Sequence, residues 1–315
     1  MKLRGALTDH GFKGQFSGHE TFPLRHLWLK KAYDEVAKTE SGASKSLFSE
    51  DKAIVTFGVG KNMVSAIRHW ALTCEVIKED GEVYRPTRLG RLIFDDEEGL
   101  DPYLETPATN WLLQWMIAGR PERSTTWYYA FNHLAPQVFD HDAVATPIGE
   151  LCHARGWTRA SAATIKRDVE CFLRSYVPAT SKKFTDDSME PVLAQLGLIR
   201  AVSSKSFEFR RGPKPSLPDG VFLFALTEFW RRHAIDQNTL SVESIAYESG
   251  SPGRVFKIDE ASLTDRLARI GESSNNAFIW SDTAGVRNVA RRKPDVDPIM
   301  FLPSAYSSSS ERRVA

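Results

Sequence analysis

The sequence predicts a mainly α-helical α+β protein that carries small β-hairpins and is built from tandem winged-helix-like, helix-turn-helix modules. In residues 48–94 and again in residues 146–212, two amphipathic helices joined by a glycine turn precede a short segment with the pattern of a hairpin. A helix-turn-helix pattern followed by a hairpin is the order of a winged helix, whose second helix enters the major groove of DNA. The repetition is one of element order, because no internal repeat is evident residue by residue.

Length and composition place the chain among ordinary globular proteins. Its 315 residues suit two or three domains, and 42% of them are hydrophobic and 26% charged. The formal net charge is only +1, so only local clusters of charge can point to nucleic acid. The three cysteines, Cys74, Cys152 and Cys171, have no CxxC spacing, which argues against a disulfide framework and a structural zinc site. With no signal-peptide pattern and no apolar run of membrane-spanning length, we expect a cytoplasmic protein without a membrane segment.

The first module is expected within residues 1–100, as a winged-helix-like domain that contains the motif "SGHETFPLR". From Pro23 onward, Leu29, Tyr33 and Val36 fall on one face of a helix that should begin near Pro23 and end near Lys38. The second helix of the helix-turn-helix follows the turn at Gly58 and Gly60. Its outer face carries His69 and four residues that we expect to contact DNA, although any exposed helix face has a similar composition: Lys61, Asn62, Ser65 and Arg68.

The second module is expected within residues 101–235. It begins with an aromatic-rich helical linker, residues 103–134, that should pack the domains together. Residues 146–177 then predict a helix, a turn at Gly156 and a second helix. The buried stripe of that second helix should be Ile165, Val169, Phe172 and Tyr176. Further candidates for DNA contact lie near its start, although they could also form an ordinary solvent-exposed helix face. They are Arg159, Ser161, Thr164, Lys166 and Arg167.

A third, C-terminal module is expected within residues 236–303. Residues 241–272 have the pattern of helix, loop and helix, and residues 276–293 have that of a hairpin. The serine-rich tail, residues 304–315, is expected to be disordered.

Basic residues cluster on the hairpins predicted for the second and third modules. The wings of winged helices commonly lie along phosphates, where lysine and arginine displace counterions. The alternative is that these charges line a solvated strand edge and block aggregation. The residues expected to contact phosphates are Lys205, Arg210, Arg211, Arg287, Arg291, Arg292 and Lys293.

Several catalytic signatures are absent from the sequence. It contains no P-loop, no GxGxxG after a strand, no GxSxG and no HExxH. We therefore expect no nucleotide-hydrolysis machinery in this chain.

The segment "SGHETFPLRHLWLKK" (17–31) resembles the N-terminal signature of the SspB family, with softer support from "FGVGKNMVSAIRHW" (57–70) and "SPGRVFKIDE" (251–260). The resemblance spans most of residues 15–300. It implies the DNA-nicking component of bacterial single-strand phosphorothioation systems, which replace a non-bridging phosphate oxygen with sulfur, and so a role in DNA modification and antiviral defence. The partners that it implies are double-stranded DNA, a cysteine desulfurase, an ATPase and an ATP-pyrophosphatase-like sulfur-transfer protein, and a homodimer stays open.

Nicking is phosphodiester hydrolysis, which needs a base for water, positive charge on the developing phosphorane and a proton for the leaving oxygen. We assign these catalytic roles to His19, Glu20 and Arg25 of the motif. The histidine suits a base or acid, the glutamate can position it or hold a divalent magnesium or manganese ion, and the arginine can grip two phosphate oxygens. No full set of metal ligands is evident. The structural alternative is that Glu20 or Thr21 caps a helix and that Arg25 pairs with a carboxylate.

The sequence thus predicts a DNA-binding protein that nicks one strand to admit sulfur chemistry. The alternative is a non-catalytic DNA-binding adaptor or transcription regulator of winged-helix type, whose partners carry out the chemistry. A third class is a scaffold in which the winged helices bind other proteins.

Overall fold

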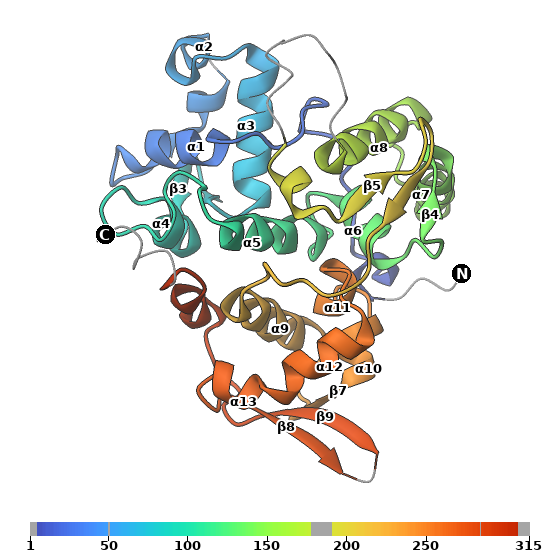
Figure 1. The fold of residues 1–315 in the computed structure, drawn as a ribbon. Helices are drawn as coiled ribbons and strands as arrows, with labels where there is room; N and C mark the ends of the chain where they lie inside the picture. Colours follow the sequence, from blue (N-terminus) through green and yellow to red (C-terminus); the bar gives the residue numbers. More distant parts are fainter. Residues whose placement is uncertain (1–4, 50, 178–190, 284, 308–315) are drawn as a thin grey trace.

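The computed structural model describes residues 5–49, 51–177, 191–283 and 285–307, and its architecture is mainly helical α+β (Figure 1). Within these residues the strands form three small antiparallel sheets of three strands each. The α+β fold class predicted from the sequence is therefore confirmed.

The first unit closes its sheet by pairing its first strand with its last. The sheet order is β1-β3-β2, and Tyr84 of β3 pairs with Ala43 on one side and Glu79 on the other. A short helix, α4 (Arg88–Phe94), follows the sheet. The elements of the unit, in chain order, are α1 (Trp28–Ala37), β1 (Ala43–Ser44), α2 (Lys52–Phe57), α3 (Lys61–Thr73), β2 (Ile77–Asp80) and β3 (Val83–Pro86).

The second unit repeats this order, with sheet order β4-β6-β5. Gly156 ends α7 with a φ of 64°, a left-handed conformation that glycine adopts without strain, and the Ser161 side chain caps α8 by accepting from the backbone N–H of Thr164. The predicted helix, glycine turn and helix are confirmed. The elements are α6 (Thr125–Asn132), β4 (Val138–Phe139), α7 (His141–Arg155), α8 (Ala162–Tyr176), the 3₁₀ helix η4 (Val192–Leu196), β5 (Ile199–Ala201) and β6 (Phe207–Phe209).

The third unit has the same order with additional short helices, and its sheet order is β7-β9-β8. In each of the three sheets the last strand therefore lies between the other two. The elements are α9 (Asp219–His233), β7 (Thr239–Ser241), α10 (Val242–Tyr247), α11 (Pro252–Val255), α12 (Glu260–Ala268), α13 (Ile270–Ser273), β8 (Phe278–Thr283), β9 (Val286–Arg291) and the 3₁₀ helix η5 (Pro298–Ala305).

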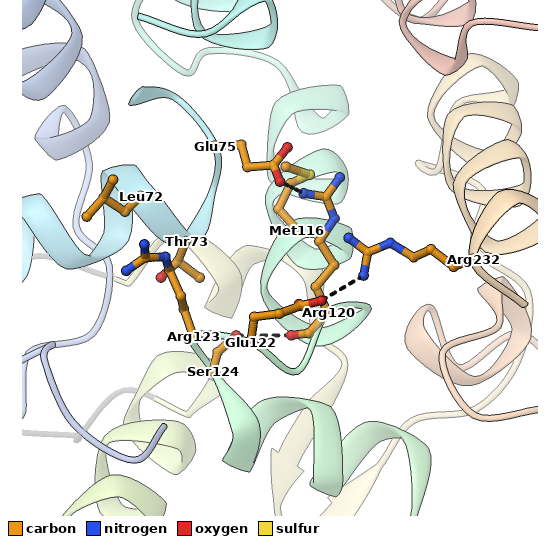
Figure 2. Close-up of a pocket in the computed structure, with 9 residues that line it drawn as sticks. All are labelled: Leu72, Thr73, Glu75, Met116, Arg120, Glu122, Arg123, Ser124 and Arg232. Carbon is orange, nitrogen blue, oxygen red and sulfur yellow. Dashed lines mark hydrogen bonds and ion pairs between the residues drawn. The ribbon is translucent and has the colours of Figure 1, made fainter. Parts of the chain in front are cut away.

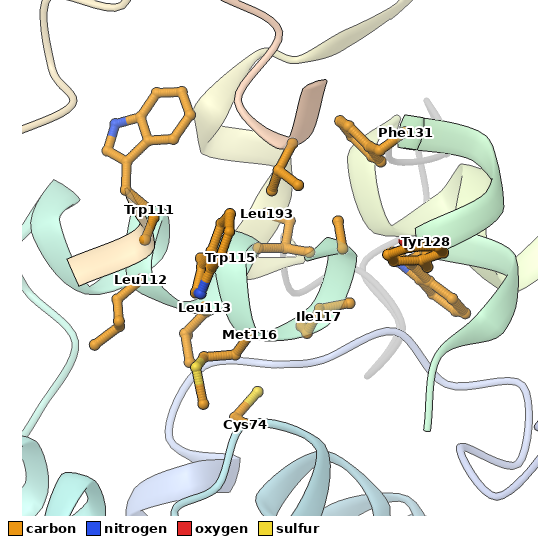
Figure 3. Packing of buried hydrophobic residues seen from close by; sticks show 14 of the residues in the cluster. Cys74, Trp111, Leu112, Leu113, Trp115, Met116, Ile117, Tyr128, Phe131 and Leu193 are labelled. Carbon is orange, nitrogen blue, oxygen red and sulfur yellow. The ribbon is translucent and has the colours of Figure 1, made fainter. Parts of the chain in front are cut away.

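The helix α5 (Pro107–Ala118) lies between the three units and is buried on almost every side (Figures 1 and 3). Its Gln114 donates a hydrogen bond to the carbonyl of Val255 in the third unit at 3.0 Å and accepts one from Tyr176 of the second unit at 2.6 Å. Cys74, which follows α3 of the first unit, packs near Met116 (Figure 3). The aromatic-rich segment is thus a central packing element, as its composition predicted.

Two expectations about the ends of elements are wrong. The first helix begins at Trp28 rather than near Pro23, because Leu27 adopts a left-handed φ of 64° and offers no side-chain cap. The disordered tail does not begin at residue 304, because Ser304 and Ala305 belong to η5 and Tyr306 is buried and hydrogen-bonded to Thr109. The remaining tail residues, 308–315, lie outside the described residues.

Gly90 of α4 provides a test of how tightly the first unit is packed. A Cβ atom at this position would stand 2.1 Å from the carbonyl oxygen of Val76. Backbone cannot give way as a flexible side chain can, so we expect Gly90→Ala to lower the free energy of unfolding by about 1–3 kcal/mol.

Gly149→Ala is the matched control, because Gly149 also lies in a helix and a Cβ there meets nothing within 4 Å. It should raise the free energy of unfolding by roughly 0.5–1 kcal/mol. Urea unfolding followed by circular dichroism measures both variants, and equal stability of the two would contradict the packing at Gly90.

Candidate functional site

Residues 17–27 of the motif form a tight, strained turn, and the helix starts only at Trp28. Glu20, Thr21 and Leu27 have left-handed φ angles of 47°, 66° and 64°, which cost energy for residues with a side chain. Gly18 has a φ of 112°, and a Cβ there would stand 2.6 Å from Nδ1 of His69. Strain of this kind persists only where the surrounding contacts fix the backbone, and it is frequent at functional sites.

The contact that fixes this turn is a buried pair between His19 and Asp168 of α8. His19 Nε2 lies 2.5 Å from the Asp168 carboxylate, and both side chains are almost fully buried. On the other side of the ring, Nδ1 accepts a hydrogen bond from the backbone N–H of Thr21 at 3.1 Å. The pair therefore joins the first unit's leading segment to the second unit's second helix.

Opposing influences act on the protonation of His19. Burial of the ring lowers its pKa, whereas the nearby Cys171 and Asp168 side chains raise it, and the net shift is upward. The N–H of Thr21 needs a lone pair on Nδ1, which only the neutral ring offers. A proton on Nε2, donated to Asp168, satisfies both neighbours of the neutral ring.

The second histidine of this cluster was misplaced by the sequence analysis. His69, expected on the outer face of α3, is buried and packs edge-on against His19, with ring centroids 5.6 Å apart. Burial lowers its pKa well below the ordinary value, and nearby positive charge lowers it further, from His19 when that ring is protonated and from Arg123 and Arg68. His69 is therefore a neutral packing partner of His19 and does not face solvent.

The three residues predicted to be catalytic face three different environments. His19 faces Asp168, Glu20 is exposed, and Arg25 is buried with its guanidinium carbon 5.3 Å and 5.4 Å from the ring centroids of Phe22 and Trp28. The partner of His19 was missed. Asp168 occupies the face of α8 that the apolar stripe marks as buried, and a carboxylate at such a position needs a partner, which is the signal that could have revealed it.

The residues predicted to contact DNA from α3 and α8 are mostly accessible. Lys61 and Asn62 are exposed at the start of α3, whereas Ser65 and Arg68 are half-buried. Near α8, Ser161 is committed to capping the helix and Thr164 is half-buried. The exposed basic side chains of this region are Arg159, Lys166 and Arg167.

The hairpin arginines divide into exposed and packed residues. Arg287 is 3.1 Å from the carboxylate of Glu260, and Arg291 donates to the carbonyl of Ile235 and covers the ring of Trp230. These two side chains have structural partners within the third unit. The other predicted residues on or beside the hairpins are exposed: Lys205, Arg210, Arg211, Arg292 and Lys293.

A groove of about 680 Å³ lies between residues 10–17 and the turn that joins α7 to α8. Phe12 and Trp157 meet edge to face in it, with centroids 5.7 Å apart. Lys13 and Arg159 are exposed in its lining. Arg159 and Thr164 were predicted from the sequence to contact DNA. The groove itself was not predicted, because the two walls of the groove are about 140 residues apart in the chain.

A smaller pocket of about 210 Å³ lies where α3, the α5–α6 connection and α9 meet (Figure 2). Three arginines line it, but each has a carboxylate partner, so the pocket is an ion-pair network between the units. The pairs are Arg120–Glu75, Arg120–Glu228, Arg123–Glu79 and Arg232–Glu122.

The described side chains do not assemble a protein-built metal site. No group of three or more histidine, cysteine, aspartate or glutamate side chains in the described ranges is placed to hold an ion. In the same part of the chain, no helix has the length and apolar character needed to cross a lipid bilayer.

Replacing Asp168 by asparagine tests the pair, because it removes the carboxylate charge and keeps the shape of the side chain. We expect the pKa of His19, which lies above 6.5 in the native protein, to fall, because burial then meets less opposition. Histidine NMR signals followed against pH measure this change. The signal of His69 is the internal control and should not titrate in either protein.

The raised pKa of His19 also predicts how the free energy of unfolding changes with pH. The stability contributed by the protonated form of the pair is complete below pH 6.5, the ordinary value, and is lost as the pH rises through the folded-state pKa, while the neutral ring still donates to Asp168. Asp168→Asn should flatten that decline in urea unfolding. A native His19 that titrates at or below 6.5 would contradict both expectations.

The chain shares its fold with solved structures. The chain is similar over 94% of its length, and over 88% of the other chain, to a structure described as "SspB crystal structure", with a TM-score of 0.80 and 29% identity. It is also similar over 95% of its length, and over 97% of the other chain, to a "Magnesium ion-bound SspB crystal structure", with a TM-score of 0.77 and 27% identity. No curated protein matches the sequence.

Residues 16–306 match the family described as "Protein of unknown function (DUF4007)". The match begins at Phe16, one residue before the motif, and ends at the buried Tyr306. The resemblance to the SspB family, expected from the motif, is confirmed by the two structures. This chain belongs to the DUF4007 family.

Proposed function

We propose that this protein is the DNA-binding component of a bacterial phosphorothioation system, and that it nicks one strand of double-stranded DNA so that sulfur can be introduced. The observation that carries the proposal is the likeness to SspB over nearly the whole of both chains. In this role the partners are the cysteine desulfurase, the ATPase and the ATP-pyrophosphatase-like protein that supply sulfur. Supporting evidence comes from the order of elements and from the exposed basic residues.

We infer that the three units are winged-helix-like modules, which the sequence placed in residues 1–100, 101–235 and 236–303. The first helix of the third unit, α9 (Asp219–His233), lies before residue 236, so the third unit starts earlier than those bounds. Each unit runs helix, strand, two or more helices, strand and strand, with the last strand in the middle of its sheet. In this arrangement α3 and α8 are the helices that follow a turn and precede the hairpin, which is the position of a recognition helix. The exposed Lys61 and Asn62 at the start of α3 then face the major groove.

The basic residues that stay exposed support phosphate contact by the hairpins and by the start of α8. Arg287 and Arg291 leave this set because they are held within the third unit. Phosphate contacts position a protein on DNA without reading its sequence. The residues that we assign to the phosphate-contacting set are Arg159, Lys166, Arg167, Lys205, Arg210, Arg211, Arg292 and Lys293.

A non-catalytic DNA-binding adaptor is the second candidate, and the burial of His19 favours it. The exposed fraction of His19 is 4%, and both ring nitrogens are engaged by Asp168 and Thr21. A buried ring held in this way cannot reach a phosphodiester without local opening. The described residues also offer no ligand set for the magnesium named for the SspB relative, so we derive no step through a metal.

Removing exposed charge from a hairpin tests DNA binding. We expect Arg210→Gln combined with Arg211→Gln to weaken binding to every duplex sequence. The plot of log affinity against log salt should flatten by about 0.9 for each phosphate that the protein no longer neutralises. Gel shifts at several salt concentrations measure the slope.

Lys38→Gln combined with Arg231→Gln is the control. It removes the same charge from sites outside the hairpins and should leave the slope unchanged. Identical slopes for the two variants would remove this hairpin from the interface.

Relaxation of supercoiled plasmid separates the nickase from the adaptor. If the protein nicks, the native chain should convert supercoiled to open-circular DNA with magnesium or manganese present. Glu20→Gln is then the clean test of the motif, because Glu20 is exposed and its replacement should leave the melting temperature nearly unchanged. We expect it to abolish nicking and to leave DNA affinity within about threefold, because the role assigned to Glu20, positioning His19 or holding a divalent ion, needs the carboxylate charge. A native protein that binds but never nicks would favour the adaptor.

A further inference from the structure

We propose that the groove between residues 10–17 and the α7–α8 turn accepts a nucleotide that has left the base stack of a DNA strand. This inference rests on the proposed DNA binding and deepens it, because it names the form of DNA that the site takes. The groove, of about 680 Å³, has room for a nucleotide together with its flanking phosphates.

The aromatic lining fits an unstacked base. Trp157 is half-buried, with Phe12 at 5.7 Å and Phe16 at 6.0 Å between ring centroids, so its orientation is fixed by two neighbours. Gly14 permits this packing, because a Cβ there would stand 2.6 Å from the Trp157 ring and 2.7 Å from that of Phe16. A rigid, accessible indole is the platform on which single-stranded bases stack without regard to sequence.

The charges of the lining fit a phosphate backbone. Lys13 and Arg159 are exposed, and Arg155 adds a third positive charge while it donates to the carbonyls of Leu7 and Asp9. The acid in the lining, Glu122, is already paired with Arg232 at 3.2 Å. The groove therefore has positive charge beside an aromatic surface, the combination that binds single strands.

The groove is also continuous with the strained motif. Ser17 of its lining lies two residues before His19, and Thr164 lies one helical turn before Asp168. The same two segments thus form both the groove and the buried pair. A nucleotide held in the groove would therefore leave the base stack beside the motif, as a nucleotide does in proteins that extrude it from a duplex.

The test uses the full chain and a short DNA single strand with one central 2-aminopurine, alongside the same strand in a duplex. Binding of the single strand should quench 2-aminopurine fluorescence by stacking. Trp157→Ala should lower affinity for the single strand about tenfold or more and abolish the quenching, whereas Trp157→Phe should retain most of both. Arg159→Gln, at an exposed position that should not affect folding, should weaken binding and flatten its salt dependence.

Tyr103→Ala is the control, because Tyr103 is an accessible aromatic that lies between α4 and α5, outside both the groove and the hairpins. It should change neither affinity nor quenching. If the native protein binds duplex DNA but Trp157→Ala and Arg159→Gln bind the single strand like the native chain, the inference is wrong and the proposed function stands. If the native protein binds neither form of DNA, the proposed function itself fails.

Discussion

The pair of His19 and Asp168 is the contact on which the arrangement of the candidate site depends. It joins residues 149 positions apart in the chain and lies beneath a turn in which three residues with side chains adopt left-handed φ angles. Such strain needs contacts that over-determine the backbone, and the pair, the Thr21 N–H and the packing of Gly18 on His69 supply them. Removal of one partner would leave a buried group unsatisfied, which costs far more than the pair gains.

Element order could be predicted from the sequence because local signals carry it. The periodicity of α8 and the glycine that ends α7 each act within a few residues, and both were predicted. Ser161 was predicted only as a DNA contact, although it caps α8. The predicted start of α1 was wrong because non-local contacts decide it. Pro23 is a good first-turn residue locally, but the turn before it is imposed by distant contacts, and the helix therefore begins at Trp28.

The candidate site could be predicted only in part, because burial decides which charges are free and burial is a property of the tertiary structure. Arg210 and Arg291 look alike in the sequence, yet one is exposed and the other covers Trp230. Asp168 carries the clearest missed signal, a carboxylate on an apolar stripe. The groove had no local signal, since its walls come together only when the N-terminal segment packs on α7 and α8.

The buried pair and the exposed groove divide two tasks between the same segments. Burial makes His19 a poor candidate for direct attack on DNA, but it makes the pair an effective anchor for the turn that carries Glu20 at the surface. The groove beside it has the accessible aromatic and basic side chains that the buried pair lacks. Such a site would bind its ligand in the accessible groove, and the buried pair of His19 and Asp168 would keep the site rigid. The residue types of the motif are therefore explained by the geometry of the turn at least as well as by any chemistry of His19.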